Sequence, residues 1–182
     1  PVNRRQRQMC IRDRVKKNEI RIMKHHEATA VHCPSSNMKL ACGGTLSLPA
    51  YRDAGVDVRL GTDGAASSGN GLNMQAEARL AALVQRHDHW DPTLLPAVDA
   101  MDLATKGSRD WAVWDLDDVR MRPQGRANNR HLANLIFNGA DCVDLWVNGT
   151  ALRRNGTTLT IDEHAVLDEI DEAVATYYEG VE

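Results

Sequence analysis

In the first half of the chain, segments with helical spacing of apolar residues alternate with short apolar segments that are typical of buried strands. Ile20 and Met23 lie on one face of a helix that begins near Lys17. The other expected elements follow in order: a strand over 28–31, a Pro/Ser/Asn loop over 34–37, a helix over 46–55, a strand over 56–60, and helices over 72–87 and 94–107. In the helix over 72–87, the face expected to be apolar carries Leu72, Ala76, Leu80, Leu83 and Val84. Such alternation is typical of parallel βα units.

The second half of the chain has a different pattern. WAVWDLDD, LANLIF and VDLWVNGTALRRNGTTL contain two Asn-Gly turn sequences, VNGT and RNGT, so an antiparallel β segment is expected over residues 108–160. Residues 161–182 predict a terminal helix, because Ile161, Ala165, Leu167, Ile170 and Val174 line one side of it. Acidic residues in its first turn stabilise the helix, because negative charge is favourable at the positive end of the helix dipole.

Composition limits the class of protein. A chain of 182 residues with 42% hydrophobic residues can form one domain with a real core. It contains no apolar run near the roughly 18 residues of a membrane span, so no membrane association is expected. The four cysteines form no CxxC pair, which favours a reducing compartment, and we expect a cytoplasmic protein.

A basic tail over residues 1–17 carries seven Lys or Arg residues and one Asp, although the whole chain has a formal net charge of −3. A nucleic-acid arm is the alternative that such a charge run suggests, but the tail has no aromatic residues to stack on bases. We therefore expect no nucleic-acid binding. QRQMCIRDR resembles translated sequencing adaptor, so the tail is either a solvated extension or sequence foreign to the protein.

Two polar residues stand at the ends of the two expected strands. His32 follows the first strand, and Asp63 follows the second and precedes a run of small residues. They are separated by 31 residues, one βα repeat, so we expect both side chains to project from neighbouring strands into the same active-site mouth. By itself, Asp63 could simply cap the following turn, and His32 could be a packed core histidine.

Four stretches together resemble the amidohydrolase superfamily, in its branch of methylthioadenosine/S-adenosylhomocysteine deaminases and triazine hydrolases (chlorohydrolases). They are VHCPSSNMKLACGG, VDVRLGTDGAAS, LNMQAEARLAALVQ and VDLWVNGTALRRNG. The resemblance implies an α/β fold: the last two βα units of a metal-dependent (β/α)8 barrel over 18–107, a small β-sandwich segment over 108–160, and a C-terminal helix over 161–182. The chain would then be a C-terminal fragment.

The same resemblance implies the chemistry. In such enzymes the aspartate of Gly-Thr-Asp-Gly binds the catalytic divalent metal, usually zinc, and contacts the metal-bound water and the substrate; this role falls on Asp63. The expected activity is hydrolysis of a non-peptide C–N bond, deamination of a purine nucleoside or related small heterocycle. His32 is a candidate substrate contact, and the small residues after Asp63 are expected to leave space for the substrate. A homo-oligomer is expected for the full-length parent.

The sequence also departs from the family pattern. HDH at 87–89 has the spacing of the family's His-x-His metal ligands, but it follows a helix, so we expect it on the surface. The family's other histidine ligands are not visible, so the chain alone is expected to be inactive and weakly stable. Three alternatives stay open: an s-triazine chlorohydrolase, a non-catalytic relic or interaction module that uses its β segment, and the basic-arm nucleic-acid binder.

Overall fold

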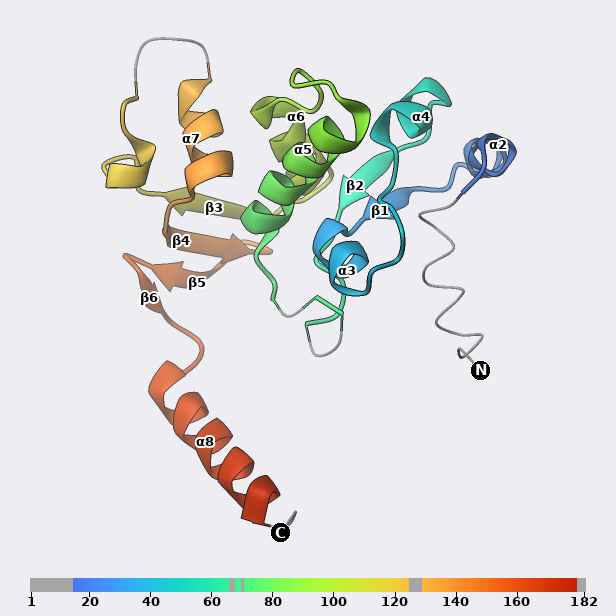
Figure 1. Cartoon of the computed structure of the whole chain (residues 1–182). Coiled ribbons are helices and arrows are strands. Elements are labelled where there is room, and N and C mark those ends of the chain that lie inside the picture. Colours follow the sequence, from blue (N-terminus) through green and yellow to red (C-terminus); the bar gives the residue numbers. More distant parts are fainter. Residues whose placement is uncertain (1–14, 66–67, 70, 125–128, 180–182) are drawn as a thin grey trace. The chain divides into compact units, whose positions relative to one another are not determined.

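The computed structural model describes residues 15–65, 68–69, 71–124 and 129–179 (Figure 1). Most of the basic tail therefore lies outside the described residues, as do Ala66 and Ser67 in the loop after Asp63. None of the helices in the described ranges is both long and apolar enough to cross a lipid bilayer.

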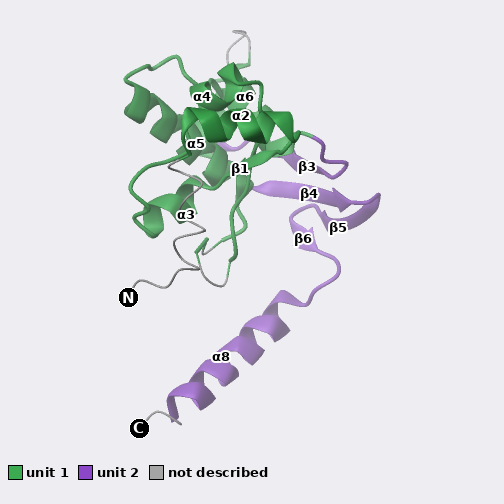
Figure 2. Ribbon diagram, turned by 90° about the vertical axis from the view of Figure 1, so that its right-hand side faces the viewer, with its two compact units in different colours: residues 1–106, 120–139 green, residues 107–119, 140–182 purple. Residues whose placement is uncertain are grey.

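The chain divides into two compact units (Figure 2). Unit 1 comprises residues 1–106 and 120–139, and unit 2 comprises residues 107–119 and 140–182. The first boundary lies next to the one expected at residue 107. The division nevertheless differs from the expected one, because residues 120–139 return to unit 1.

Unit 1 consists of helices around two parallel strands. In chain order its elements are α2 (Lys17–His25), β1 (Ala30–His32), α3 (Pro34–Lys39), α4 (Leu48–Asp53), β2 (Val58–Leu60), α5 (Met74–His89), α6 (Ala97–Thr105) and α7 (Arg130–Asn138). A 3₁₀ turn, Val119–Met121, precedes α7. Strands β1 and β2 pair in parallel, with His32 opposite Leu60. The expected βα alternation is therefore present.

The two faces of this small sheet differ in burial. Ala30, Val58 and Leu60 belong to the hydrophobic core together with three alanines of α5 and residues of α4 and α6. Val31, the middle residue of β1, points to the opposite face of the sheet and is 47% exposed. One face of the sheet is thus covered by helices, and the other is open in the described chain.

The buried face of α5 is not the one expected from its leucines. Ala78, Ala81, Ala82 and Gln85 are buried, whereas Leu83 is exposed. Leu72 is also exposed and precedes the helix, which begins at Met74. The small alanine side chains allow the backbone of α5 to approach β2 and α6 closely, and the leucines occupy the flanks.

Two segments form helices where strand or loop was expected. Pro34–Lys39 is a helix, with proline in its first turn, where the missing N–H breaks no helical hydrogen bond. LANLIF belongs to α7 and not to the β segment. Its apolar residues satisfy helical as well as strand spacing; Ile136 belongs to the core of unit 1, and Leu132 and Phe137 pack against that core.

Unit 2 contains a four-stranded antiparallel sheet in the order β3-β4-β5-β6. Its strands are β3 (Trp111–Trp114), β4 (Cys142–Val147), β5 (Thr150–Arg154) and β6 (Thr157–Thr158). Both expected Asn-Gly turns are confirmed, since Asn148, Gly149, Asn155 and Gly156 all have positive φ. The described strands form a single sheet and not the two layers of the expected sandwich.

The terminal helix α8 (Glu163–Glu179) confirms the helix expected near the C-terminus. No residue of α8 is buried within the described chain. Its apolar side, with Val166, Ile170 and Val174, is therefore exposed to solvent.

Candidate functional site

Asp63 lies in the loop that follows β2, with its side chain exposed. Its backbone has φ of 59°, in the left-handed region that aspartate and asparagine adopt more readily than most residues. Carboxylate Oδ2 accepts a hydrogen bond from the Ser36 hydroxyl at 2.6 Å, and Oδ1 accepts one from the Gly64 N–H at 2.7 Å. The Ser36 hydroxyl and then the Gly64 N–H lower the pKa of Asp63 below its usual value, so the side chain is an oriented, ionised carboxylate.

The loop around Asp63 closes on itself. The Gly69 N–H donates to the Gly64 carbonyl oxygen at 2.8 Å. A Cβ atom on Gly69 would overlap the Thr62 carbonyl oxygen, and one on Gly61 would lie 2.7 Å from Val31 Cγ1. Close approach to a backbone oxygen therefore requires glycine at position 69, whereas at position 61 the Val31 side chain would have to shift.

Gly69→Ala is expected to open this loop and to lower the free energy of unfolding by about 1–3 kcal/mol, because the new methyl group would overlap a backbone carbonyl that cannot swing away. Urea unfolding of both proteins measures the loss. Gly71→Ala is the matched control, since a Cβ there meets nothing within 4 Å. Equal stability of the two variants would contradict the close approach.

His32 lies inside unit 1. It is 1% exposed, on the same face of the sheet as the core residues Ala30 and Leu60. Neither ring nitrogen has a hydrogen-bond partner within the described residues. The structure therefore does not bring the imidazole out beside the exposed Asp63, and this burial offers no support for the predicted substrate contact.

Burial also makes His32 a pH-sensitive element. Burial lowers its pKa from 6.5 to about 4, and Asp88 opposes part of this effect. Because the unfolded chain binds the proton more readily, stability is full above about pH 6.5 and falls as the pH drops toward 4, by up to about 3 kcal/mol. The carboxyl groups of Asp57 and Asp63 have lowered pKa values, so the stability that they contribute is lost at the acid end of this range and below it.

His32→Leu is expected to flatten the slope of unfolding free energy against pH between 4 and 6.5, as measured by urea unfolding at a series of pH values. His131→Leu, at an exposed histidine, should leave the slope unchanged. An unaltered slope in His32→Leu would mean that the buried imidazole does not control acid stability.

HDH at 87–89 occupies the last turn of α5, and all three side chains are exposed, as expected. Asp88 Oδ2 accepts a hydrogen bond from the Thr45 hydroxyl at 3.0 Å. Among the residues that the structure describes, no three His, Cys, Asp or Glu side chains lie together in a way that could hold a metal ion.

Sequence reasoning missed two residues near the candidate site. Ser36 was expected only as part of the Pro/Ser/Asn loop over 34–37, whereas its hydroxyl binds Asp63 from 27 positions away. Glu77 of α5 is buried, and its Oε2 accepts a hydrogen bond from the Ser35 N–H at 3.2 Å. Serine in a motif is a weak indication of such a contact, and nothing in the helical pattern of α5 points to Glu77.

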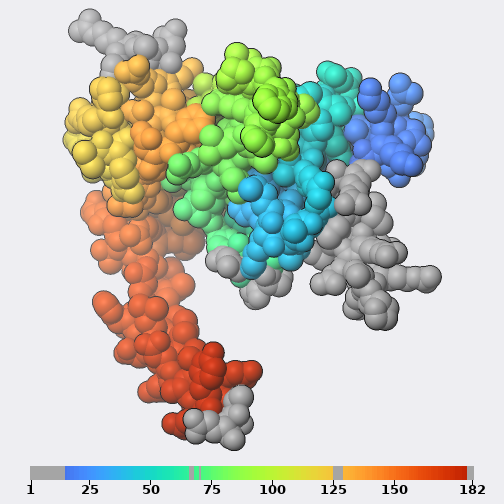
Figure 3. Space-filling view, viewed as in Figure 1, coloured from blue at the N-terminus to red at the C-terminus, as the bar shows by residue number. Residues whose placement is uncertain are grey.

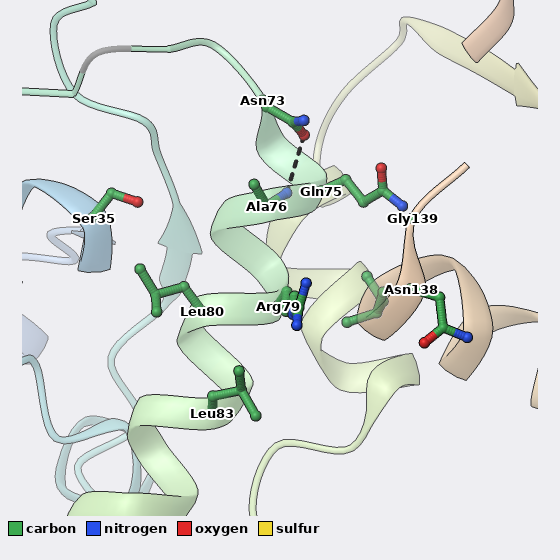
Figure 4. A pocket seen from close by; sticks show the side chains of 10 residues that line it. Ser35, Asn73, Gln75, Ala76, Arg79, Leu80, Leu83, Asn138 and Gly139 are labelled. Atoms are coloured by element: carbon green, nitrogen blue, oxygen red, sulfur yellow. Dashed lines mark hydrogen bonds between the residues drawn. The ribbon is translucent and has the colours of Figure 1, made fainter. Parts of the chain in front are cut away.

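A hollow of about 480 Å³ lies elsewhere in unit 1, between α5 and α7 (Figure 4). Arg79, Leu80 and Leu83 of α5 line it, and Asn73 caps the same helix by accepting the Ala76 N–H at 3.0 Å. Neither Asp63 nor His32 is among its lining residues, although Ser35 of α3 is.

Known proteins provide the class to which this site belongs. The model of the amidohydrolase family matches residues 6–109, more than half of the chain, and the chain belongs to this family. Among curated relatives, a 5-methylthioadenosine/S-adenosylhomocysteine deaminase of Pyrococcus furiosus is 36% identical over 165 residues, covering 83% of this chain and 39% of the relative. One of the same name from Haloquadratum walsbyi is 39% identical over 157 residues, covering 78% of this chain and 34% of the relative.

Solved structures agree with the fold. A zinc-bound adenosine deaminase from Xanthomonas campestris matches with a TM-score of 0.77 and 25% identity, over 88% of this chain and 40% of that one. An atrazine chlorohydrolase mutant from Arthrobacter aurescens, complexed with zinc and atraton, matches with a TM-score of 0.71 and 25% identity, over 85% of this chain and 38% of that one. These matches confirm the expected α/β fold as the C-terminal part of a (β/α)8 amidohydrolase barrel. The chain spans well under half the length of the relatives it matches.

Proposed function

We propose that this chain supplies the catalytic aspartate, Asp63, to a hydrolase that acts on a non-peptide C–N bond. The observation that carries the proposal is the carboxylate itself: it is ionised, exposed and held by hydrogen bonds from Ser36, Gly64 and Ser68 just beyond the C-terminal end of a parallel strand. The substrate class we propose is a purine nucleoside or related heterocycle, because the curated relatives are named as deaminases of methylthioadenosine and S-adenosylhomocysteine.

The proposed cofactor is a divalent metal, zinc by analogy with the two zinc-bound solved structures. The described residues do not fit such an ion by themselves, because they offer Asp63 as a single donor and no group of three possible ligands. A catalytic zinc normally has at least three protein ligands. The 182-residue chain alone is therefore expected to hold no stoichiometric zinc after dialysis.

The chemistry assigned to this chain is proton transfer by Asp63. Hydrolytic deamination adds water to the ring carbon that bears the amino group and releases ammonia. A carboxylate beside the attacking water can accept its proton and then return a proton to the departing amino group. The lowered pKa keeps Asp63 ionised near neutral pH, as the first of these steps requires.

The proposal is tested with a chimaera in which this chain replaces the matching part of the Pyrococcus furiosus relative. Release of ammonia is measured with 5-methylthioadenosine and with adenosine, in the presence of zinc, and chloride release is measured with atrazine. Turnover of a nucleoside supports the proposal. Turnover of atrazine alone would assign the chain to the chlorohydrolase alternative, and a folded, zinc-loaded chimaera without either activity would contradict the proposed function.

The exposed apolar side of α8 is the observation that favours the alternative of an interaction module. Size-exclusion chromatography with light scattering separates the two cases. A single defined oligomer of the isolated chain would favour the module, whereas polydisperse aggregates are expected from part of an enzyme.

A further inference from the structure

We propose that Ser36 is a positioning residue for the Asp63 carboxylate, and that Glu77 holds Ser36 in place through the backbone of α3. The inference rests on the proposed function of Asp63 and adds two residues to it. Neither is expected to contact the substrate, because both are buried: Ser36 is 3% exposed and Glu77 is 5% exposed.

The hydrogen bond from Ser36 anchors Asp63 to another element of the fold. The Gly64 N–H that binds Oδ1 belongs to the next residue and moves with the same loop. The Ser36 hydroxyl, by contrast, comes from α3 and reaches Oδ2 at 2.6 Å. It therefore fixes which way the carboxylate points relative to the sheet, whereas the Gly64 N–H and the Ser68 hydroxyl, which also bind the carboxylate, belong to the loop of Asp63 itself.

Helix α3 needs support of its own, because a six-residue helix has little stability by itself. Glu77 supplies one such support, with its carboxylate accepting the Ser35 N–H at 3.2 Å. Glu77 stands on the sixteen-residue helix α5, whose neighbouring Ala78 and Ala81 are fully buried in the core. Figure 3 shows α3 and α5 side by side on one face of unit 1.

A continuous set of contacts therefore runs from the core to the candidate catalytic group. Glu77 is fixed by α5, the Ser35 N–H is fixed by Glu77, and the adjacent Ser36 hydroxyl then meets Asp63. A misplacement of a catalytic group by about 1 Å can cost a factor of about 100 in rate. Loss of either contact should thus reduce turnover without removing a group that binds substrate.

The first test uses the folded chimaera and does not depend on activity. The ¹³C resonance of the Asp63 carboxyl carbon and the amide resonance of Gly64 are compared in the unmodified chimaera, Ser36→Ala, Ser36→Thr and Ser35→Ala. Both resonances should shift in Ser36→Ala and stay close to their original positions in Ser36→Thr, which retains a hydroxyl. Ser35→Ala is the matched control, because Ser35 contributes its backbone N–H to the contact with Glu77.

The second test uses the chimaera. Ser36→Ala is expected to lower kcat by about 10- to 100-fold with little change in KM, and Ser36→Thr should recover most of that loss. Glu77→Ala should lower kcat in the same way, whereas Glu77→Gln, which keeps an acceptor for the Ser35 N–H, should be much less affected.

Unchanged Asp63 and Gly64 resonances in Ser36→Ala would overturn the inference. So would a Ser36→Ala chimaera whose kcat equals that of the Ser35→Ala chimaera. Failure of the proposed function is distinguishable from this result. In that case the unmodified chimaera is inactive, while the resonances still establish whether Ser36 orients the carboxylate.

Discussion

Asp63→Asn is expected to lower kcat of the chimaera by about 10²- to 10⁴-fold, the usual contribution of a positioned acid or base. The amide of asparagine cannot accept a proton from water at neutral pH, so the step assigned to Asp63 is lost. Steady-state ammonia release measures the effect, and the free energy of unfolding should fall by only about 1 kcal/mol, because the asparagine NH2 group cannot accept the Gly64 N–H.

The asparagine variant isolates chemistry from structure for two reasons. Asparagine adopts the left-handed φ of 59° observed at this position about as readily as aspartate. Its amide oxygen can also accept the Ser36 hydroxyl and keep the loop attached to α3. A variant that folds normally and retains more than a tenth of the original kcat would show that Asp63 is not the catalytic base.

Gln85→Ala is expected to lower the free energy of unfolding by about 3 kcal/mol. The side chain is fully buried, and its amide serves two backbone groups before and at the start of α4. Oε1 accepts the Leu48 N–H at 2.9 Å, and Nε2 donates to the Leu46 carbonyl oxygen at 2.6 Å. Truncation leaves both groups unpaired in the core, and each unpaired buried group costs about 1–3 kcal/mol.

Urea unfolding measures this loss, with Leu83→Ala as the control on the same helix. Leu83 is exposed, so its truncation should cost less than about 1 kcal/mol. A loss in Gln85→Ala no larger than in the control would show that the Gln85 amide does not hold the segment before α4 to α5.

Short-range features were predictable because they depend on neighbouring residues. Each Asn-Gly pair of unit 2 forms its turn, since asparagine and glycine accept the positive φ values that a tight hairpin requires. The helix over residues 74–89 and the strand before Asp63 follow from local spacing of apolar residues. The position of Asp63 beyond a strand end was predictable for the same reason.

Features that depend on packing between distant segments were not predictable in the same way. The apolar spacing of LANLIF fits a strand as well as a helix, and only its packing in unit 1 selects the helix. On α5, the leucines suggested one buried face, but close approach to β2 and α6 buries the alanines and Gln85. Helix propensity and periodicity do not include the partner surface, and that surface decides which face is covered.

The sequence by itself determined the βα alternation, the hairpin turns and the identity of the carboxylate after the second strand. Only the tertiary structure decided that His32 is enclosed among core residues while Asp63 is exposed. It alone also brought Ser36 to Asp63 and Glu77 to Ser35, because these hydrogen bonds join residues 27 and 42 positions apart. A hydrogen bond requires its two groups to meet within about 3 Å, and over such separations the packing of whole helices and strands, not the local chain, sets that distance.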